Sequence, residues 1–405
     1  MDANKGITLS KKISGDQDAD ATIFGGVLSN HAGRLFEMTQ SRDKTLRHAA
    51  LDLIGHLLRQ GQINPIETVP FLLALQGDVD EEEVRLLALK LLMIEGERRK
   101  EMLRQKFRAG VKQAYIFQSI VYPDKAEVSA LTTMRTNGAL HTECVFSCVF
   151  RECFMSSRKQ RHGLFRDLLG LFNPSKLYSE DEEVGRLDLP LLSFASQVLA
   201  HLPYSVASDP LYIIHDISST IALQGADLID RLERFLRPYG LAGKDEYDES
   251  NLEEDDLEIA AKRKIPHHSK ESTPLLQPGF DMTTFSRMCG EAASMCLLLR
   301  LKSFLRRAYN LSESRILGFD PEAKERIAEK ASFRNTNYVF DSKLHLRSLS
   351  AIASDSELDS LIRQYAEFRQ LMRAESASEV RASDSEGENQ KSSKRKRNPC
   401  NALEG

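Results

Sequence analysis

Two similar stretches decide the fold of this chain: Arg47-His-Ala-Ala-Leu-Asp-Leu-Ile54 and Arg85-Leu-Leu-Ala-Leu-Lys-Leu-Leu92, at an offset of 38 residues from Arg47 to Arg85. In both, apolar side chains recur every three or four residues, which is typical of a helix with one buried face. Gly61 is expected to end the first helix, and Asn64-Pro65 with Glu67 predicts the start of the next. Short connections of this kind indicate antiparallel neighbouring helices.

The offset lies just below the roughly 40 to 47 residues of HEAT and armadillo units, whose paired helices bury their apolar faces by stacking on neighbours. The Val/Leu-Arg step followed by Ala and Leu resembles the HEAT pattern in particular. A capping box is expected at Asp80 and Glu83, before a stretch that continues after Gly96 into Arg98 to Tyr122. Further helices are predicted at Leu140 to Met155, Lys159 to Phe172, Leu187 to Leu202, Leu211 to Leu223, Ala226 to Leu236, Thr283 to Tyr309 and, more weakly, Pro321 to Ala331 and Glu357 to Ala374. No strand-like alternation competes with them, so we predict an all-α fold, a HEAT-repeat α-solenoid.

Composition divides the chain into five predicted segments. Polar and charged stretches with few apolar residues cannot bury enough surface to fold alone. We therefore expect a poorly ordered segment at 1–29, a HEAT-repeat solenoid at 30–239, a disordered acidic and basic insertion at 240–279, C-terminal helices completing the solenoid at 280–374, and a disordered tail at 375–405.

Charge and cysteine content indicate in which compartment the protein acts and which kinds of partner it binds. The formal net charge is -4 with 28% charged residues, so any surface that attracts nucleic acid must be local. No apolar run reaches the roughly 18 to 20 residues of a membrane span, and the polar start is unlike a secretory signal. Six cysteines among 405 residues fit reduced thiols better than a disulfide framework. We expect a cytosolic or nuclear protein that binds no membrane.

Three basic stretches are candidate binding sites. The clearest surrounds a helix junction and consists of Arg151, Arg158, Lys159, Arg161, His162 and Arg166; a second, on a long helix, consists of Arg300, Lys302, Arg306 and Arg307. Lysine and arginine on such faces bind phosphate without reading sequence, although an ordinary solvated helix face has the same composition. The third stretch lies in the tail and consists of Lys394, Arg395, Lys396 and Arg397. It has the pattern of a nuclear import signal, and a basic tail without that role is the alternative.

The sequence contains no pattern that we assign to a metal, a cofactor or catalysis. Cys144, Cys148 and Cys153 with His141 are expected to be core residues, since their gaps place the thiols on an apolar helix. His267-His268 has no nearby ligands at a recognisable spacing. Phosphate-binding loops, nucleophile elbows and zinc-protease motifs are missing, so we predict a protein that is not an enzyme.

A family resemblance enters at Leu202-Pro-Tyr-Ser-Val-Ala-Ser-Asp-Pro-Leu-Tyr-Ile-Ile-His215. This segment resembles a signature of the sister chromatid cohesion protein 2 / Nipped-B family of cohesin loaders, carried here by Pro203, Tyr204, Pro210, Leu211, Ile214 and His215. The stretches around Arg47, Pro65 to Leu75 and Arg158 to Phe172 are similar to the family's HEAT helices, and Leu297 to Tyr309 and Tyr365 to Met372 to its last helices. The resemblance covers roughly residues 30 to 375.

The resemblance implies a hook-shaped HEAT solenoid that engages cohesin subunits and double-stranded DNA, and that promotes cohesin loading onto chromatin in the nucleus. It implies that any ATP hydrolysis belongs to cohesin. Because family members are several times longer, we expect this chain to be a C-terminal part that does not bind the partner protein, sister chromatid cohesion protein 4. The alternative function is a HEAT-repeat adaptor for complex assembly or transport that binds no DNA.

Overall fold

The structure is a computed structural model of the chain, and it describes Gly26 and residues 31–123, 128–136, 139–173, 188–239, 281–323, 331–340, 342 and 361–377. Within these residues the fold is helical apart from one two-stranded sheet and a single bridge between Val206 and Ala331. This confirms the predicted all-α class. The predicted insertion at 240–279 and most of the predicted tail lie outside the described residues.

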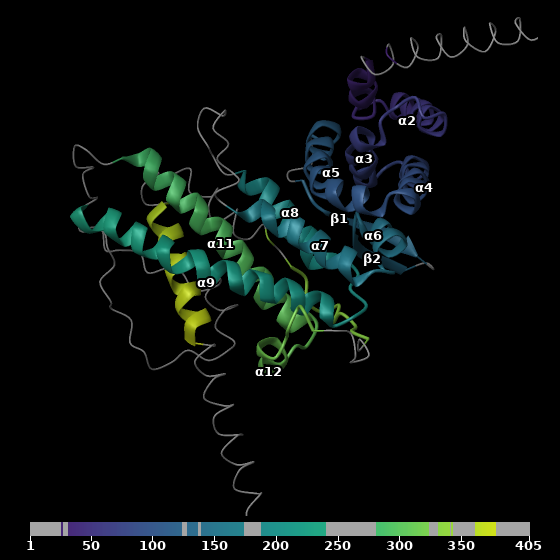
Figure 1. The fold of residues 1–405 in the computed structure, drawn as a ribbon. Helices are drawn as coiled ribbons and strands as arrows, with labels where there is room; N and C mark the ends of the chain where they lie inside the picture. Colours follow the sequence, from purple (N-terminus) through teal and green to yellow (C-terminus); the bar gives the residue numbers. More distant parts are fainter. Residues whose placement is uncertain are drawn as a thin grey trace, which may run out of the picture.

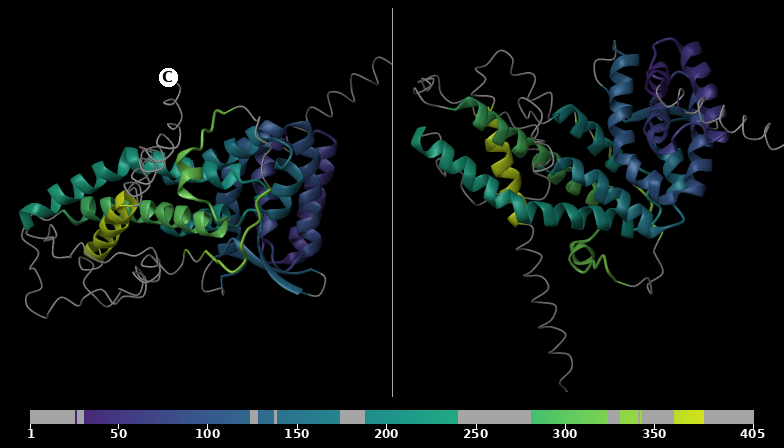
Figure 2. Two further views of the ribbon diagram at one scale, coloured as in Figure 1. Left: turned by 90° about the horizontal axis from the view of Figure 1, so that it is seen from below. Right: turned by 45° about the horizontal axis from the view of Figure 1, so that its top comes forward.

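The helices follow one another as an extended array (Figures 1 and 2). A helix at 31–38 precedes α2 (Lys44–Arg59), α3 (Pro65–Ala74), α4 (Glu82–Arg98) and α5 (Lys100–Val121). The middle of the array contains β1 (Leu131–Thr136), β2 (Ala139–Cys144), α6 (Ser147–Phe154), α7 (Arg158–Leu169) and α8 (Leu189–His201). The far end is built from α9 (Ser208–Leu236), α11 (Met282–Ala308), the short α12 (Glu313–Leu317) and a helix at 361–377. Short 3-10 turns occupy Leu75–Gly77, Gly170–Phe172 and Arg237–Tyr239.

Local signals in the sequence set several helix ends. Gly61 has a φ of 69°, a left-handed conformation that suits glycine, directly after α2. The Asn64 side chain accepts a hydrogen bond from the Ile66 N–H, with Pro65 in the first helical position of α3. The capping box expected at Asp80 and Glu83 is wrong, because α4 begins at Glu82 with Glu81 as its N-cap, and no side chain caps this end of the helix.

Three predicted helices are corrected by the structure. Residues 139–144, the first part of the helix expected at Leu140 to Met155, form strand β2, which pairs antiparallel with β1 from Leu131↔Cys144 to Thr136↔Ala139. The helix in this region begins only at Ser147. The two helices expected on either side of Gly225 form the single helix α9, because Gly225 lies against Met372 of the 361–377 helix, where the glycine provides the space for contact.

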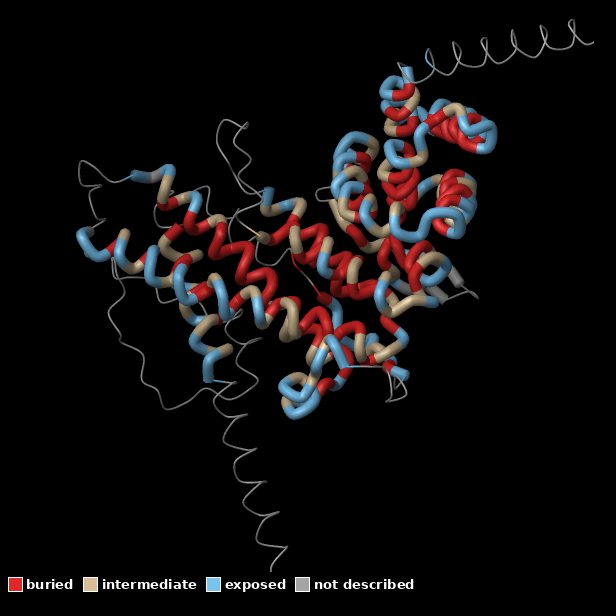
Figure 3. Tube along the Cα trace, viewed as in Figure 1, coloured by how far each residue is buried: buried red, intermediate tan, exposed pale blue. Residues whose placement is uncertain are grey.

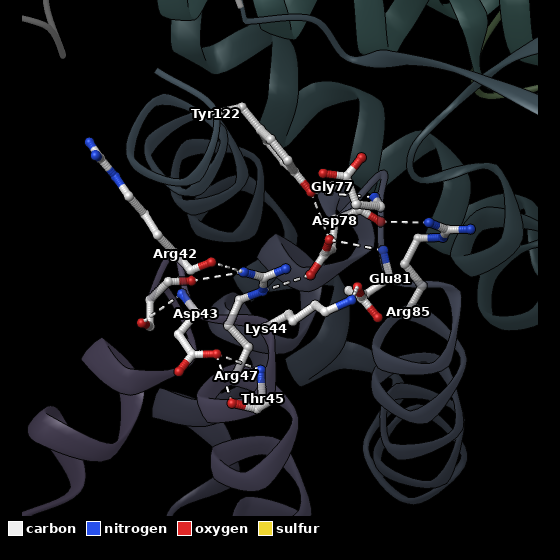
Figure 4. A network of polar contacts seen from close by, with 12 residues as sticks. Arg42, Asp43, Lys44, Thr45, Arg47, Gly77, Asp78, Glu81, Arg85 and Tyr122 are labelled. Carbon is white, nitrogen blue, oxygen red and sulfur yellow. Dashed lines mark hydrogen bonds and ion pairs between the residues drawn. The ribbon is translucent and has the colours of Figure 1, made fainter. Parts of the chain in front are cut away.

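A buried polar network joins the first repeats at Asp78 (Figure 4). Arg47 of α2 donates from Nε to Asp78 Oδ2 at 2.8 Å, and Tyr122, directly after α5, donates its hydroxyl to Oδ1 at 2.7 Å. Arg85 of α4 donates from Nη1 to the Asp78 carbonyl at 2.6 Å. Buried charges must be paired, and Arg47 and Asp78 are 2% and 0% exposed. The two arginines that mark the sequence repeat therefore both bind Asp78, Arg47 through the carboxylate and Arg85 through the main-chain carbonyl, and they have a structural role.

The core is a continuous stripe along the inner faces of the helices (Figure 3). The contact between α3 and α5 is especially close, because a Cβ placed on Gly110 would lie 2.6 Å from Leu73 Cβ. Phenylalanine rings fill the centre around α5 to α7, where Phe107 lies edge-on to Phe154. Among the described helices, none is both long and apolar enough to cross a membrane.

Candidate nucleic-acid interface

Helix α7 carries most of the predicted basic cluster. Ser157 caps its N-terminus by accepting a hydrogen bond from the Gln160 N–H. Lys159 is exposed, whereas Arg158 is half-buried and donates from Nη1 to the Ala323 carbonyl at 3.4 Å. Arg151 lies on α6 and pairs with Glu143 of β2 at 2.9 Å. The cluster therefore extends over two helices, and its members differ in how far they are available to a ligand.

Arg161 does not lie on the surface, which corrects its place among the candidate ligand contacts. The residue is 3% exposed and its Nε lies 3.0 Å from both carboxylate oxygens of Asp209, which is fully buried at the start of α9. Its Nη1 also donates to the Met155 carbonyl at 2.6 Å. A buried and paired guanidinium cannot reach a phosphate, so Arg161 joins α7 to α9.

His162 and Arg166 enclose the ring of Tyr212 on α9. The His162 ring stacks on it with centroids 4.1 Å apart, and Arg166 lies 6.0 Å from the Tyr212 centroid while donating from Nε to its hydroxyl at 3.1 Å. Burial, together with neighbouring Arg158 and Arg161, lowers the pKa of His162 to about 3, so this histidine is neutral at physiological pH. Arg166 itself remains exposed, with its guanidinium positioned by the tyrosine.

The signature motif spans the turn after α8 and the first turns of α9. Pro203 and Tyr204 lie in the turn, and Pro210, Leu211 and His215 lie in α9. Tyr204 is buried, lies edge-on to Phe165 of α7 at 5.4 Å between centroids, and donates its hydroxyl to the Leu199 carbonyl. His215 is half-buried with its ring against Phe319. The packing of these residues fixes the turn between α8 and α9, and it thereby places Asp209 against Arg161. Asp209 was not among the residues predicted from the sequence, although it lies directly before Pro210 of the signature.

The second basic stretch holds other parts of the chain. On α11, Arg300 pairs with Glu367 and Lys302 with Glu375, both on the 361–377 helix. Arg306 pairs with Glu313 of α12 at 2.6 Å. Arg307 is half-buried. The second basic stretch therefore differs from α7 in that three of its four residues form ion pairs with acids of other helices. The sequence alone did not predict these pairs.

The cysteines predicted to be core residues are placed as follows. Cys144 ends β2 and is buried, while Cys148 and Cys153 lie half-buried on α6, so one of the three thiols is not on the expected helix. Burial raises the pKa of Cys144 to about 12 and that of Cys153 to about 11, which keeps both thiols protonated at physiological pH.

The third basic stretch, in the tail, lies outside the described residues. This applies to all four of its members: Lys394, Arg395, Lys396 and Arg397. Their assignment as a nuclear import signal therefore stays a prediction from the sequence.

Comparison with known proteins gives a consistent set of relatives. Residues 24–220 match the family described as sister chromatid cohesion C-terminus. The Nipped-B protein of Drosophila melanogaster is 22% identical over 369 residues, and the alignment covers 88% of this chain and 16% of that protein. The Nipped-B-like protein of Mus musculus is 24% identical over 387 residues, covering 88% of this chain and 13% of that protein. This chain thus spans about a sixth or less of the length of these relatives.

A solved structure has the same fold. The C-terminal fragment of the Chaetomium thermophilum cohesin loader SCC2 superimposes with a TM-score of 0.55, covering 89% of this chain and 22% of that chain. Sequence identity over the superposition is 10%, so this similarity concerns the helical architecture. The part of this chain that matches the family includes α7, the signature turn and the first part of α9, the elements that carry the Arg161–Asp209 pair and the Tyr212 stack.

Proposed function

This chain belongs to the Nipped-B family, whose sister chromatid cohesion C-terminus it carries, and we propose that it is a non-enzymatic helical scaffold in cohesin loading. In this proposal it acts in the nucleus, binds cohesin subunits through its helical array, and contacts double-stranded DNA through basic side chains. Chromatin association and sister chromatid cohesion follow from those two contacts. We also propose the domain boundaries expected from composition, with the solenoid at 30–239 and its last helices at 280–374.

The outward face of α7 is the observation on which the DNA contact rests. Lys159 and Arg166 lie seven residues apart, two helical turns, and both are exposed, with Arg158 next to Lys159. Asp209 neutralises Arg161 beneath them and His162 is uncharged, so the charge of this face comes from its outward residues. We assign the DNA contact to Arg158, Lys159 and Arg166, and we leave Arg161 out.

Such a face suits a protein that acts on chromatin of any sequence. Each lysine or arginine that neutralises a phosphate releases counterions, so affinity falls as salt rises and does not depend on base identity. Arg166 is held against Tyr212, which reduces the side-chain entropy that it would lose on binding phosphate. The α11 stretch is a weaker candidate, because Arg300 and Lys302 are already paired within the chain.

The test is a charge reversal on α7 with a matched control. We expect Lys159→Glu with Arg166→Glu to weaken binding of a duplex by the full chain and to reduce the salt slope of log K by roughly two. The control variant, Arg34→Glu with Lys90→Glu, makes the same charge change at exposed residues of other helices and should alter the slope much less. Equal losses in both variants would refute a specific contact on α7.

A pull-down with purified cohesin separates this function from the alternative adaptor. Capture of cohesin by the full chain, with a DNA contribution that fades as salt increases, supports a loading scaffold. Cohesin capture with no measurable DNA affinity at physiological salt would refute the DNA contact and favour an adaptor. Failure of the folded chain to capture cohesin would contradict the proposal itself.

A further inference from the structure

We propose that α9 and α11 form a binding site for an amphipathic helix, and that the 361–377 helix is an intramolecular occupant that a partner helix of the same chemistry replaces. The residues of the site that contact the 361–377 helix include Gly225, Glu233, Cys289, Arg300 and Lys302. In Figure 1 this helix, drawn in yellow, crosses α9 at the far end of the array, and its upper end lies beside α11. The proposal concerns a protein partner and does not depend on the DNA contact assigned to α7.

An apolar stripe provides the shared part of the contact. The buried side chains of the occupant, which follow a helical period, are Leu361, Tyr365, Phe368 and Leu371. Phe368 is fully buried, and Met372 fits against α9 at Gly225, where a Cβ would lie 2.6 Å from its terminal methyl carbon. A helix with large apolar residues at this spacing is therefore required, as in other helix-in-groove contacts.

The two walls of the site are the faces of α9 and α11 that contact the 361–377 helix. Their charges determine which amphipathic helix can bind and in which direction it runs. The α11 wall is basic, with Arg300 paired to Glu367 and Lys302 paired to Glu375. On α9, the carboxylate of Glu233 lies 3.6 Å from the guanidinium of Arg369. A matching helix must present two acids, spaced as Glu367 and Glu375 are, to α11 and a base to α9. This complementarity defines the partner as an amphipathic helix that is acidic along one flank.

The ionic contacts are of the kind that can be exchanged. The side chains of Arg369 and Glu233 are 19% and 31% exposed, those of Arg300 and Glu367 are 21% and 27% exposed, and those of Lys302 and Glu375 are 13% and 17% exposed. Ion pairs that remain in contact with water contribute little net stability, because solvent competes for both charges. A partner helix that supplies the same stripe and the same two acids would make equivalent contacts, so occupancy depends on effective concentration and not on a unique fit.

Peptide exchange on the full chain tests this inference. The probe is a labelled peptide of residues 361–377, compared with a version carrying Glu367→Arg and Glu375→Arg. The site is opened in the full chain by Phe368→Asp and, as a second route that alters only partly exposed side chains, by Glu367→Arg with Glu375→Arg. We expect the unmodified peptide to bind each opened chain about tenfold more tightly than it binds the unaltered chain, whose site is occupied.

A charge swap then tests the walls. The reversed peptide should bind the Phe368→Asp chain about tenfold more weakly than the unmodified peptide, and adding Arg300→Glu with Lys302→Glu to that chain should restore it. Restored binding supports the assigned contacts. Indifference to the swap, no binding to either opened chain, or loss of the cooperative fold in both opened chains would overturn the proposal, the last because the helix would then be an integral part of the core.

Discussion

Replacing Asp209 with Asn removes the charge that neutralises Arg161 and leaves the shape of the site unchanged. The pair is almost completely buried, with Arg161 3% and Asp209 0% exposed, and the guanidinium Nε lies 3.0 Å from each carboxylate oxygen. Removing one partner of a buried pair leaves an uncompensated charge in a medium of low polarity, which costs about 3–5 kcal/mol. Since a typical domain is stable by roughly 5–15 kcal/mol, Asp209→Asn should bring the chain close to unfolding.

A second substitution distinguishes the cost of the stranded charge from the loss of the pair itself. In Arg161→Met with Asp209→Asn no charge remains buried, so we expect most of the lost stability to return, with a net cost below about 2 kcal/mol. Urea unfolding followed by far-UV circular dichroism measures both, because the chain has no tryptophan for fluorescence. A loss below about 1 kcal/mol in Asp209→Asn, or a double variant no more stable than the single, would refute this account of the pair.

Two further predictions concern packing and pH. Gly110→Ala should destabilise the chain by about 2 kcal/mol in urea unfolding, because the new Cβ would lie 2.6 Å from Leu73 Cβ. The control Gly33→Ala has nothing within 4 Å of the new Cβ, so it should be neutral or stabilising by up to about 1 kcal/mol. Burial lowers the pKa of His162 to about 3 and that of His201 to about 4, so the unfolded chain binds protons that the folded chain does not. Stability should therefore be complete above about pH 6.5 and fall by about 1 kcal/mol per histidine per pH unit from there toward about pH 4, as pH-dependent urea unfolding would show. His162→Phe should reduce that slope, and an unchanged slope would contradict the assignment.

Local signals that act within one helix were readable in the sequence. The apolar period of α2 and α4, the left-handed Gly61 and the Asn64-Pro65 start of α3 each depend on neighbours only a few residues away. Among the described residues, the hairpin of β1 and β2 was not predicted from the sequence, and the residues of β2 were assigned to a helix. The Asn137-Gly138 pair was a hairpin signal in the sequence, and the apolar residues that follow Cys144 obscured it.

The roles of the basic residues could not be predicted in the same way. Arg161 and Lys159 are two residues apart and alike in sequence context, yet one is buried against Asp209 and the other is exposed. The acid that decides this lies 48 residues away. Likewise Arg300 and Lys302 read as an ordinary basic face until the 361–377 helix brings Glu367 and Glu375 beside them.

The sequence by itself determined that this chain is an array of amphipathic helices, since the period of apolar residues and the turn signals are local properties of the backbone and its nearest side chains. The family could also be predicted from the sequence, because the signature from Leu202 to His215 is a continuous run of residues. Only the tertiary structure decided which cations face solvent, since whether a charge is buried and paired depends on residues distant along the chain. The physical reason is that packing between helices sets the exposure of an arginine and its electrostatic partners. That packing depends on residues far apart in the sequence, so a local pattern cannot predict it.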